Sequence, residues 1–570
     1  MKKLLIFVCV LFSAKSLVSQ ETYSTYTNPV NLDYTYMIYD AAKDISYRSG
    51  ADPAVVEFQD EYYMFVTRSL GYWHSENLQD WEFIEPEKWY FQGSNAPAAH
   101  NYKDSILYVT GDPSGAMSLL YTDTPKKGDW KAIPYILTDL QDPAFFIDDD
   151  DQAYMYWGSS NVFPIRGKKL DAERNFRPGE TVELFNLNAQ VNGWERLGND
   201  HSAGERGYLE GAWMTKHNDK YYLQYGAPGT EFNVYGDGAY ISDDPLGPFQ
   251  YMPNNPFSYK PGGFINGAGH GSTVKGPAEM YWHFGTMAVA VNVRWERRIG
   301  MFPTYFDKEG LMYSDTYFGD YPHYGPNEEG RRGEFTGWML LSYDKPVEVS
   351  SVHEDYSGKN LVDENIQTFW VAQTNNDQQW VQIDLENSAD IYAVQLNYHD
   401  YKSDLYGRYS DLKHQYVIEV SDDGKNWRTI IDKSKNQTDV PNDYVELPAP
   451  EQARFVRYKN IAVPTPYLSI SGLRVFGKGK GDALKRPKKF SVERQEDRRD
   501  ALITWEKQEE AQGYNVLWGI APDKLYNNWM VYKDDELYLR SLSSDQEYYF
   551  ALESFNENGV SKRTKPVKIK

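Results

Sequence analysis

Cysteine is almost absent from this 570-residue chain, which has a single one, Cys9. Cys9 lies in an apolar run near the N-terminus that we expect to be removed, so the exported chain would have none. This excludes disulfides, thiolate catalysis and cysteine-ligated metals. It also favours a bacterial envelope protein over a disulfide-rich eukaryotic secreted protein.

Long apolar runs are also scarce. Lys2 and Lys3, the apolar residues 4–12 and the small or polar residues 13–20 have the three regions of a secretory signal peptide, so we assign residues 1–20 to one. No later segment approaches the eighteen apolar residues that a membrane span needs. The sequence therefore predicts a secreted or periplasmic protein that does not insert into a membrane.

Basic residues are too few to balance the acidic ones. The chain has 59 Lys and Arg against 82 Asp and Glu, a formal net charge of -23. Such a field repels nucleic acid and anionic membrane surfaces, so we expect a neutral partner. Amphipathic helical runs are not visible, whereas 47 Tyr and 16 Trp favour β structure. The length indicates more than one domain.

The first half of the chain repeats itself. An aromatic strand, a second strand and a polar turn recur about every fifty residues between residues 46 and 315, with aromatic strands at 62–67, 107–111, 154–158, 221–226 and 281–285. Five passes of short strands without helices predict a five-bladed β-propeller, to which we assign residues 21–325.

Three carboxylates open segments of the same design: Asp52-Pro-Ala-Val-Val, Asp142-Pro-Ala-Phe-Phe and Glu210-Gly-Ala-Trp-Met. Equivalent positions at the start of each blade's inner strand ring one mouth of the central channel. With Ala96 and His270 these acids form the predicted ring. Converging acids suit acid/base chemistry.

Glycosidic hydrolysis needs an acid for the leaving oxygen and a base for water, and carboxyls about 6.5–9.5 Å apart give inversion. A third carboxylate nearby would keep the acid protonated. Asp-Pro alone is common turn chemistry, and we interpret Asp112-Pro113 and Asp244-Pro245 as turns that fit no catalytic pattern.

Other candidates have a competing structural interpretation. His270, in Gly267-Ala-Gly-His-Gly, is a candidate metal ligand, substrate contact or structural hydrogen-bonding residue, but no second ligand stands at metal spacing, so we predict no metal there. Trp73 is the best candidate to stack on a sugar, with core packing as the alternative. The acidic residues 148–151 suit a solvated hairpin turn better than calcium ligands.

The composition changes after residue 325. Residues 338–477 contain short alternating segments typical of a β-sandwich. A basic, Gly-containing stretch at 478–489 reads as a linker. Residues 490–570 alternate again, as a small immunoglobulin-like sandwich would.

The repeated acids resemble glycoside hydrolase family 43, over about residues 46–315. The resemblance implies a five-bladed propeller with an inverting mechanism. It implies that Asp52 is the general base, that Glu210 is the general acid and that Asp142 sets the pKa of the acid. The family's histidine matches His270.

Two further features bear on substrate binding. The family's late arginine, which contacts substrate, matches Arg297 or Arg298, with Arg298 preferred here. Where many members have Trp-Ala-Pro-Asp in blade two, this chain has Asn95-Ala96-Pro97-Ala98. That departure changes a wall of the pocket, so subsite specificity does not carry over from other members.

The two C-terminal units also carry resemblances. Residues 338–477 are similar to a discoidin, or coagulation-factor-type, sandwich through Trp380-Val-Gln-Ile-Asp384, Ala453-Arg-Phe-Val-Arg457 and the segment 363–370. This implies carbohydrate binding through end loops and a structural calcium ion near the 363–368 turn. The last unit is similar to a fibronectin type III domain through Trp505, Leu542 and Tyr548, which implies a spacer or packing role.

The sequence thus predicts an all-β chain, a five-bladed propeller followed by a discoidin-like and a fibronectin type III β-sandwich. The predicted activity is inverting exo-hydrolysis of terminal sugars of plant-type polysaccharides or oligosaccharides, as an α-L-arabinofuranosidase or β-D-xylosidase that requires no cofactor. An exo-β-galactosidase of the same family and a non-catalytic glycan-binding protein are the alternatives. The signatures of retaining, invertase-like propellers are not seen, and the oligomeric state stays open.

Overall fold

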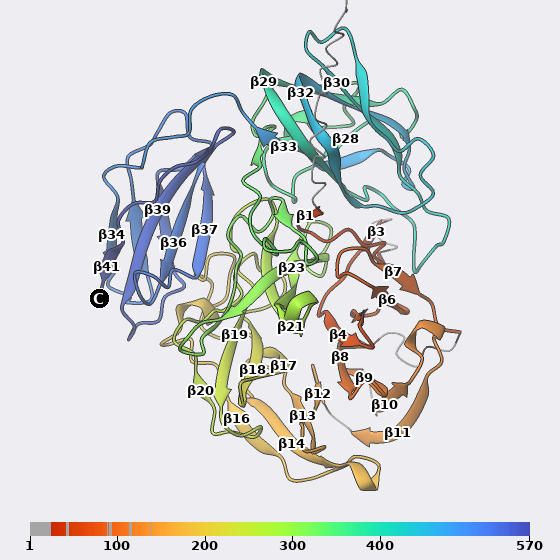
Figure 1. Ribbon diagram of the computed structural model, residues 1–570, viewed down its shortest axis with the longest axis vertical. Helices are drawn as coiled ribbons and strands as arrows, with labels where there is room; N and C mark the ends of the chain where they lie inside the picture. Colours follow the sequence, from red (N-terminus) through yellow and green to blue (C-terminus); the bar gives the residue numbers. More distant parts are fainter. Residues whose placement is uncertain (1–23, 41–44, 88, 90–93, 113–116, 138–139) are drawn as a thin grey trace, which may run out of the picture.

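The computed structural model describes residues 24–40, 45–87, 89, 94–112, 117–137 and 140–570, so the signal peptide assigned to residues 1–20 lies outside the described residues. Strands dominate the described residues, and the helices among them are short 3-10 turns. The strands form three bodies (Figure 1): a large ring coloured red to green, a cyan sandwich at one end and a blue sandwich at its side.

The ring is a five-bladed β-propeller, which confirms the predicted fold. In blades one to three the strands are β4 (Ala54–Phe58), β5 (Glu61–Phe65), β6 (Tyr72–Ser75), β7 (Glu82–Ile84); β8 (Asn95–Tyr102), β9 (Ile106–Asp112), β10 (Met117–Thr122), β11 (Lys131–Leu137); and β12 (Ala144–Ile147), β13 (Ala153–Trp157), β14 (Ile165–Asp171), with β15 (Arg177–Pro178) and β16 (Val182–Phe185) both on β14.

Blades four and five complete the ring. They contain β17 (Glu210–His217), β18 (Lys220–Ala227), β19 (Gly236–Ser242), β20 (Gln250–Tyr251), and β21 (Asn266–Lys275), β22 (Tyr281–Ala288), β23 (Arg297–Phe306), β24 (Met312–Ser314). The inner strands neighbour one another in the cyclic order β4, β8, β12, β17, β21 and back to β4. Every inner strand therefore starts at the same mouth of the channel.

Aromatic side chains fill the space between blades, as their alternation in the strands requires. Trp73 of blade one and Trp282 and Phe284 of blade five share one core cluster, which closes the ring where its first and last blades meet. The N-terminal segment adds Tyr26 and Tyr34 to the same cluster. Burial of these large side chains is the main favourable contribution to joining the blades.

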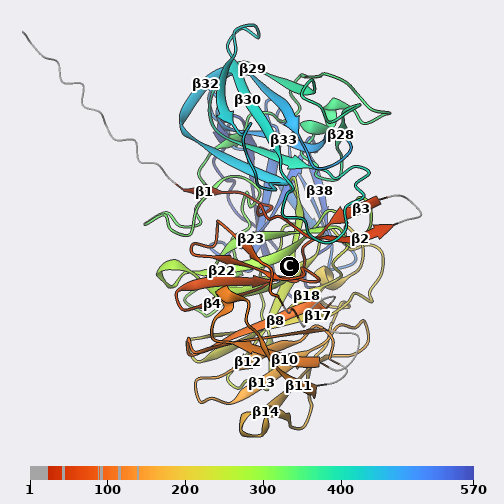
Figure 2. The same cartoon turned by 90° about the vertical axis from the view of Figure 1, so that its right-hand side faces the viewer.

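Two small strand pairs lie outside the blades. Strand β1 (Thr25–Tyr26) pairs with β25 (His323–Tyr324), and β2 (Tyr36–Asp40) pairs with β3 (Ile45–Arg48) in a two-stranded sheet of its own. Figure 2 shows β2 and β3 standing out from the propeller below the cyan sandwich. Because this hairpin belongs to no blade, its position depends on what it packs against.

The cyan body is an eight-stranded sandwich with its own core, which includes Trp370, Ile383, Val394 and Val456. Its strands are β26 (Met339–Leu340), β27 (Val347–Val349), β28 (Trp370–Val371), β29 (Trp380–Tyr398), β30 (Gln415–Ser421), β31 (Arg428–Asp432), β32 (Asn442–Ala462) and β33 (Ser469–Lys478).

The blue body packs a three-stranded sheet on a five-stranded one. The three-stranded sheet contains β34 (Ser491–Arg494), β35 (Ala501–Thr504) and β38 (Glu536–Leu539). The five-stranded sheet contains β36 (Gly513–Gly519), β37 (Asn527–Tyr532), β39 (Tyr548–Asn556), β40 (Gly559–Val560) and β41 (Val567–Ile569). Trp505 and Leu542 are core residues, and the hydroxyl of Tyr548 accepts the Ser543 N–H at 3.0 Å.

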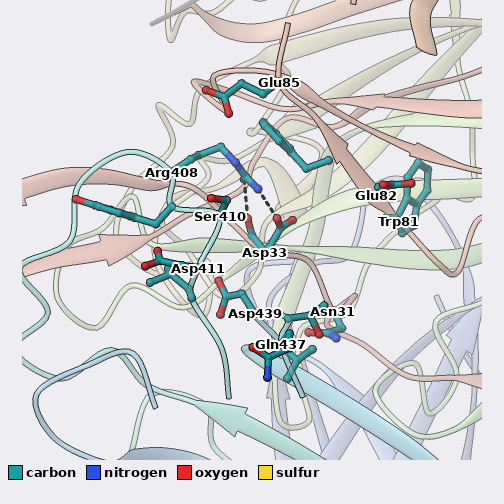
Figure 3. A pocket seen from close by; sticks show the side chains of 15 residues that line it. Asn31, Asp33, Trp81, Glu82, Glu85, Arg408, Ser410, Asp411, Gln437 and Asp439 are labelled. Atoms are coloured by element: carbon teal, nitrogen blue, oxygen red, sulfur yellow. Dashed lines mark hydrogen bonds and ion pairs between the residues drawn. The ribbon is translucent and has the colours of Figure 1, made fainter. Parts of the chain in front are cut away.

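Ion pairs whose arginines are largely buried connect the two sandwiches to the propeller. Arg196 of the propeller pairs with Asp500 of the blue sandwich at 2.5 Å. Arg408 of the cyan sandwich pairs with Asp33, at a pocket of about 1070 Å³ between that sandwich and blade one (Figure 3). Ion pairs with little exposure stay in place only when both partners do, so the bodies hold defined relative positions.

A charge cluster at the junction of the propeller and the cyan sandwich gives a stability test. Lys260 and Asp320 are almost fully buried and 3.0 Å apart, and Arg474 of the sandwich donates to the Asp320 carbonyl at 2.6 Å. Asp320→Asn leaves the Lys260 cation without its counter-charge, so we expect it to destabilise the protein by about 3–5 kcal/mol. Calorimetry of the unfolding transition measures this.

The matched control is Asp243→Asn, which removes the partner of Lys220 in a pair whose side chains are 81% and 46% exposed. Water already solvates that pair, so its loss should shift the transition little. Equal shifts for the two variants would contradict the assignment of stability to the buried cluster.

Candidate active site

A cavity of about 390 Å³ lies where the inner strands start. Four predicted residues line it together: Asp52, Asp142, Glu210 and His270. The other lining residues come from the loops around the mouth and from the β2–β3 hairpin; they are Met37, Tyr47, Thr67, Arg68, Asn95, Asp112, Ser159, Thr230, Trp295 and Arg297.

The repeat in the sequence corresponds to a repeated backbone turn. One residue at the start of each blade has a positive φ: Asp52 (56°), Ala96 (42°), Asp142 (48°), Gly211 (73°) and His270 (38°). In blades two, four and five this residue lies at a register shift of the inner strand. Left-handed residues with a Cβ are unfavourable and concentrate at functional sites.

Gly211 explains why blade four has Glu-Gly where blades one and three have Asp-Pro. The left-handed residue there is the one after the acid, and a Cβ on it would lie 2.5 Å from Cγ and Cδ2 of His270. Only glycine allows the histidine ring to approach the backbone this closely. The Glu-Gly pair thus couples the position of Glu210 to that of His270.

Asp52 faces two basic side chains. Its Oδ1 lies 3.2 Å from Nδ1 of His270 and 3.8 Å from Nη1 of Arg297. Its Oδ2 accepts the hydroxyl of Thr67 at 2.5 Å, and its N–H donates to Thr286 Oγ1 at 2.8 Å. These contacts hold the carboxylate in a single orientation at the mouth of the channel.

Glu210 faces two hydroxyl groups. Its Oε1 accepts the hydroxyl of Tyr235 at 2.8 Å, and its Oε2 accepts that of Ser159 at 3.3 Å. Burial raises the pKa of Glu210, the charge of Asp52 raises it further, and His270 opposes both. A carboxyl with a raised pKa can remain protonated near neutral pH and donate its proton.

Asp142 and His270 complete the charge cluster. Burial raises the pKa of Asp142 well above its usual range, and Glu210 and Asp52 add to the effect. Nδ1 of His270 lies 3.9 Å from Oδ2 of Asp142. Burial alone would lower the pKa of His270, but the surrounding carboxylates outweigh it and raise the pKa. An imidazolium here therefore offsets the repulsion among the acids.

The structure places Trp73 away from the cavity. Its side chain is fully buried between blades, it packs edge-on against Phe83, and its Nε1 donates to Asp33 at 2.7 Å. This placement corrects the expected sugar contact to a packing role, because the ring has no surface to offer a ligand.

Arg298 is corrected in the same way. It is 3% exposed, its Nη1 donates to the carbonyl oxygens of Arg48 and Arg297, and its guanidinium lies over Tyr34. Its neighbour Arg297 lines the cavity instead and donates to Thr230 Oγ1 at 3.0 Å. Adjacent strand residues point to opposite faces, so only one of the two could reach the channel.

The sequence indicates a turn at Asp112, but the structure places this residue in the cavity wall. It ends β9 directly opposite Asn95 on β8, and burial raises its pKa. Blade two therefore contributes a carboxylate after all, from its second strand rather than its first. Asp244, interpreted likewise, does sit in a turn, where it accepts the Leu246 N–H at 2.8 Å.

No group of three or more His, Cys, Asp or Glu side chains gathers as a metal centre in the described ranges. At the turn where the discoidin resemblance implies calcium, Asp363 accepts the Thr368 hydroxyl at 2.6 Å and the Asn365 N–H at 3.1 Å. That carboxylate therefore closes its own turn. Within the described residues no helix is long and apolar enough to cross a membrane.

Curated relatives are distant and matched in part. The chain is 33% identical over 141 residues to the Xylosidase/arabinosidase 43A of Humicola insolens, which covers 19% of this chain and 40% of the relative. It is also 26% identical over 198 residues to the Beta-xylosidase of Xylanibacter ruminicola. That match covers 31% of this chain and 59% of the relative. The chain thus spans about half the length of the curated relatives it matches.

Among solved structures, a thermostable family-43 glycoside hydrolase aligns with 22% identity and a TM-score of 0.43, over 53% of this chain and all of that one. Family models match two segments of the chain. The model for glycosyl hydrolases family 43 matches residues 43–312, and that for the F5/8 type C domain matches residues 346–473. Residues 43–312 are therefore a glycosyl hydrolases family 43 domain, and residues 346–473 behind it are an F5/8 type C domain.

Proposed function

We propose that this protein is exported and hydrolyses terminal glycosidic bonds of a polysaccharide or oligosaccharide with inversion of the anomeric carbon. The observation that carries the proposal is the cavity in which Asp52, Asp142 and Glu210, from three different blades, surround His270. Two carboxyls on opposite sides of a sugar suffice for this reaction, one as acid and one as base.

In the proposed mechanism Asp52 accepts a proton from a water molecule as the water oxygen attacks the anomeric carbon. Glu210 gives its proton to the glycosidic oxygen as the bond to carbon breaks. Tyr235 and Ser159 orient the Glu210 carboxyl through the hydrogen bonds described above. Asp142, His270 and Glu210 titrate together, because the charge of each one shifts the pKa of the others. Asp142 and His270 thereby influence whether Glu210 is protonated.

For the substrate we propose an α-L-arabinofuranoside or a β-D-xyloside. The names of two relatives, a xylosidase/arabinosidase and a β-xylosidase, support this choice. The cavity volume of about 390 Å³ is near the lower end for ligand sites and suits a single terminal sugar. A relative named Beta-D-galactofuranosidase xynD, 24% identical over 169 residues, makes a galactofuranoside the second candidate.

The leaving group would extend past Glu210 toward two exposed aromatic side chains. Phe163 is 58% exposed and Tyr208 is 45% exposed. Their loops are joined beside the acid, because Ser160 and Leu209 exchange both backbone hydrogen bonds at 2.9–3.0 Å. We propose that these rings contact the sugar on the leaving-group side. Residues 490–570 are a fibronectin type III spacer in this proposal, as their two packed sheets support.

The first test replaces the acid and the base. Glu210→Gln and Asp52→Asn should each lower kcat/KM for an arabinoside or xyloside by about 10²–10⁴-fold, because each removes one proton transfer. Proton NMR of the first product from the unaltered protein should show the inverted anomer. Asp244→Asn, at an Asp-Pro in a surface turn, is the matched control and should leave the rate unchanged. Retention, or full activity in Glu210→Gln, would refute the mechanism.

The second test uses pH. The Tyr235 hydroxyl stabilises the ionised form of Glu210 and thereby lowers its pKa. Tyr235→Phe removes this bond, so Glu210 should hold its proton to higher pH and the alkaline limb of kcat/KM should move up by about half to one pH unit. Tyr222→Phe in the same blade, whose hydroxyl bonds the Gly310 carbonyl instead, is the control. A shift toward lower pH would contradict Glu210 as the acid.

The third test concerns the leaving-group side. Phe163→Ala combined with Tyr208→Ala should lower kcat/KM on an oligosaccharide about tenfold, the size expected from losing aromatic contacts. The same variant should hydrolyse a nitrophenyl monoglycoside as the parent does, because that substrate lacks the second sugar. Tyr538→Ala, at a ring 39% exposed on the blue sandwich, is the control. Equal losses on both substrates would refute the contact.

A further inference from the structure

The β2–β3 hairpin forms part of the active-site wall but belongs to no blade. It contributes Met37 and Tyr47 to the cavity lining. An isolated two-stranded hairpin is only marginally stable in water, so these two side chains can be positioned precisely only if the hairpin docks on another body.

The F5/8 type C domain provides that body. The backbone of Tyr36 exchanges hydrogen bonds with Gly407 at 2.8 and 3.0 Å, and the Ser46 N–H donates to the Ser403 carbonyl at 2.7 Å. Both edges of the hairpin are thus paired with one loop of the sandwich. The Tyr36 hydroxyl also donates to Oδ1 of Asp400 at 2.8 Å.

A buried cation strengthens the contact. Arg48, the last residue of β3, is fully buried, and its Nε lies 3.1 Å from Oδ2 of Asp400. Its two terminal nitrogens both bind the carboxylate of Asp439. A guanidinium held by two carboxylates of another domain has a fixed position, since any displacement breaks charge-assisted hydrogen bonds in a desolvated site.

Arg48 and its neighbour Ser49 contact residues 295–298, which include part of the cavity wall. The Arg48 carbonyl accepts Nη1 of Arg298 at 2.9 Å. Ser49 donates to the Trp295 carbonyl at 2.7 Å and accepts the Arg297 N–H at 3.2 Å. Trp295 and Arg297 line the cavity, and Asp52 follows four residues after Arg48.

A second link lies beside the first, at the pocket drawn in Figure 3. Arg408 pairs with Asp33, stacks on the Phe83 ring with a distance of 3.3 Å to the ring centre, and donates to the Asp33 carbonyl at 2.7 Å. Asp439 lies near this pair in the same view. The segment 33–36 that leads into the hairpin is therefore also held by the sandwich.

We infer that the F5/8 type C domain positions the sugar-binding wall of the propeller, with Asp400 and Asp439 acting as positioning residues for Tyr47, Trp295 and Arg297 through Arg48. The sandwich is then part of the catalytic unit and does more than tether the enzyme to a glycan. This inference rests on the proposed function only where KM is measured, because that measurement needs a hydrolysed glycoside.

The test compares Asp400→Asn with Asp500→Asn in the full-length protein. Both substitutions remove a carboxylate from a buried arginine at a domain interface, but the Arg196–Asp500 pair joins the propeller to the other sandwich. We expect Asp400→Asn to raise KM at least fivefold at a temperature well below its unfolding transition, and Asp500→Asn to change KM less than twofold. A smaller folded fraction lowers the apparent kcat and leaves KM unchanged, so it cannot imitate this result.

The triple variant Arg48→Met, Asp400→Asn, Asp439→Asn serves if the single variant folds poorly. It removes the buried Arg48 guanidinium together with both of its carboxylates, so no arginine charge is left unpaired, and thermal stability should return while KM stays high. A KM within twofold of the parent in a stable triple variant, or equal KM changes for Asp400→Asn and Asp500→Asn, would overturn the inference.

Hydrogen–deuterium exchange separates this inference from the proposed function. Asp400→Asn should speed exchange in residues 45–52 and 292–298, and Asp500→Asn should not. If the parent hydrolyses no glycoside, the proposed function fails, and this exchange pattern alone decides whether the sandwich positions the wall. Unchanged exchange in both segments would overturn the inference whatever the activity.

Discussion

Mutual repulsion among carboxylates is the constraint around which the mouth of this propeller is organised. Asp52, Asp142 and Glu210 share a cavity of about 390 Å³. Asp52 and Asp142 are buried, and burial strengthens the charge interactions between them. Three negative charges cannot coexist there without compensation. Burial and the neighbouring carboxylates raise the pKa values of Asp142 and Glu210, and the carboxylates raise the pKa of His270, so both effects favour binding of protons in the cluster. A carboxyl with a raised pKa can hold a proton near neutral pH and donate it as a general acid.

The need to bring these groups together determines local backbone features. His270 approaches the backbone of Gly211 so closely that any side chain there would collide with the imidazole ring. The N–H of His270 donates to the buried Asp237 at 2.6 Å, which fixes the histidine from its other side. Positive φ angles at the start of all five blades place the corresponding residues at the channel mouth. The unfavourable conformations are tolerated because the surrounding blades are closely packed.

Periodicity explains what could be predicted from the sequence. The five blades and the positions of Asp52, Asp142, Glu210 and His270 all follow from one repeated pattern, because equivalent residues of a closed ring converge on its axis. Asp112 escaped prediction since it ends a second strand, outside the repeated position. Arg297 could not be distinguished from Arg298, because the alternation of strand β23 gives two faces but does not say which one meets the channel.

Trp73 is a second residue for which the sequence pattern allows two placements. An aromatic residue at a strand near the mouth fits both a sugar contact and a blade interface, and only the packing of Phe83 and Arg408 around it decides for the interface. Contacts between domains are even harder to predict from sequence patterns. Nothing in the spacing of Arg48, Asp400 and Asp439 indicates that they meet, since nearly the whole propeller separates the first from the other two.

The arrangement of the domains changes what the active site consists of. A propeller closes its own channel, but the wall that would recognise a sugar includes a hairpin without blade partners, and a following domain supports that hairpin. The proposed acid and base therefore depend on the blades, while in our proposal the shape of the sugar site depends on the sandwich. Chemistry and specificity are then separable. If the sandwich positions the wall as we propose, substitutions between the propeller and the F5/8 type C domain would alter which sugar fits without touching the carboxylates. Specificity would then change while the proposed mechanism is preserved.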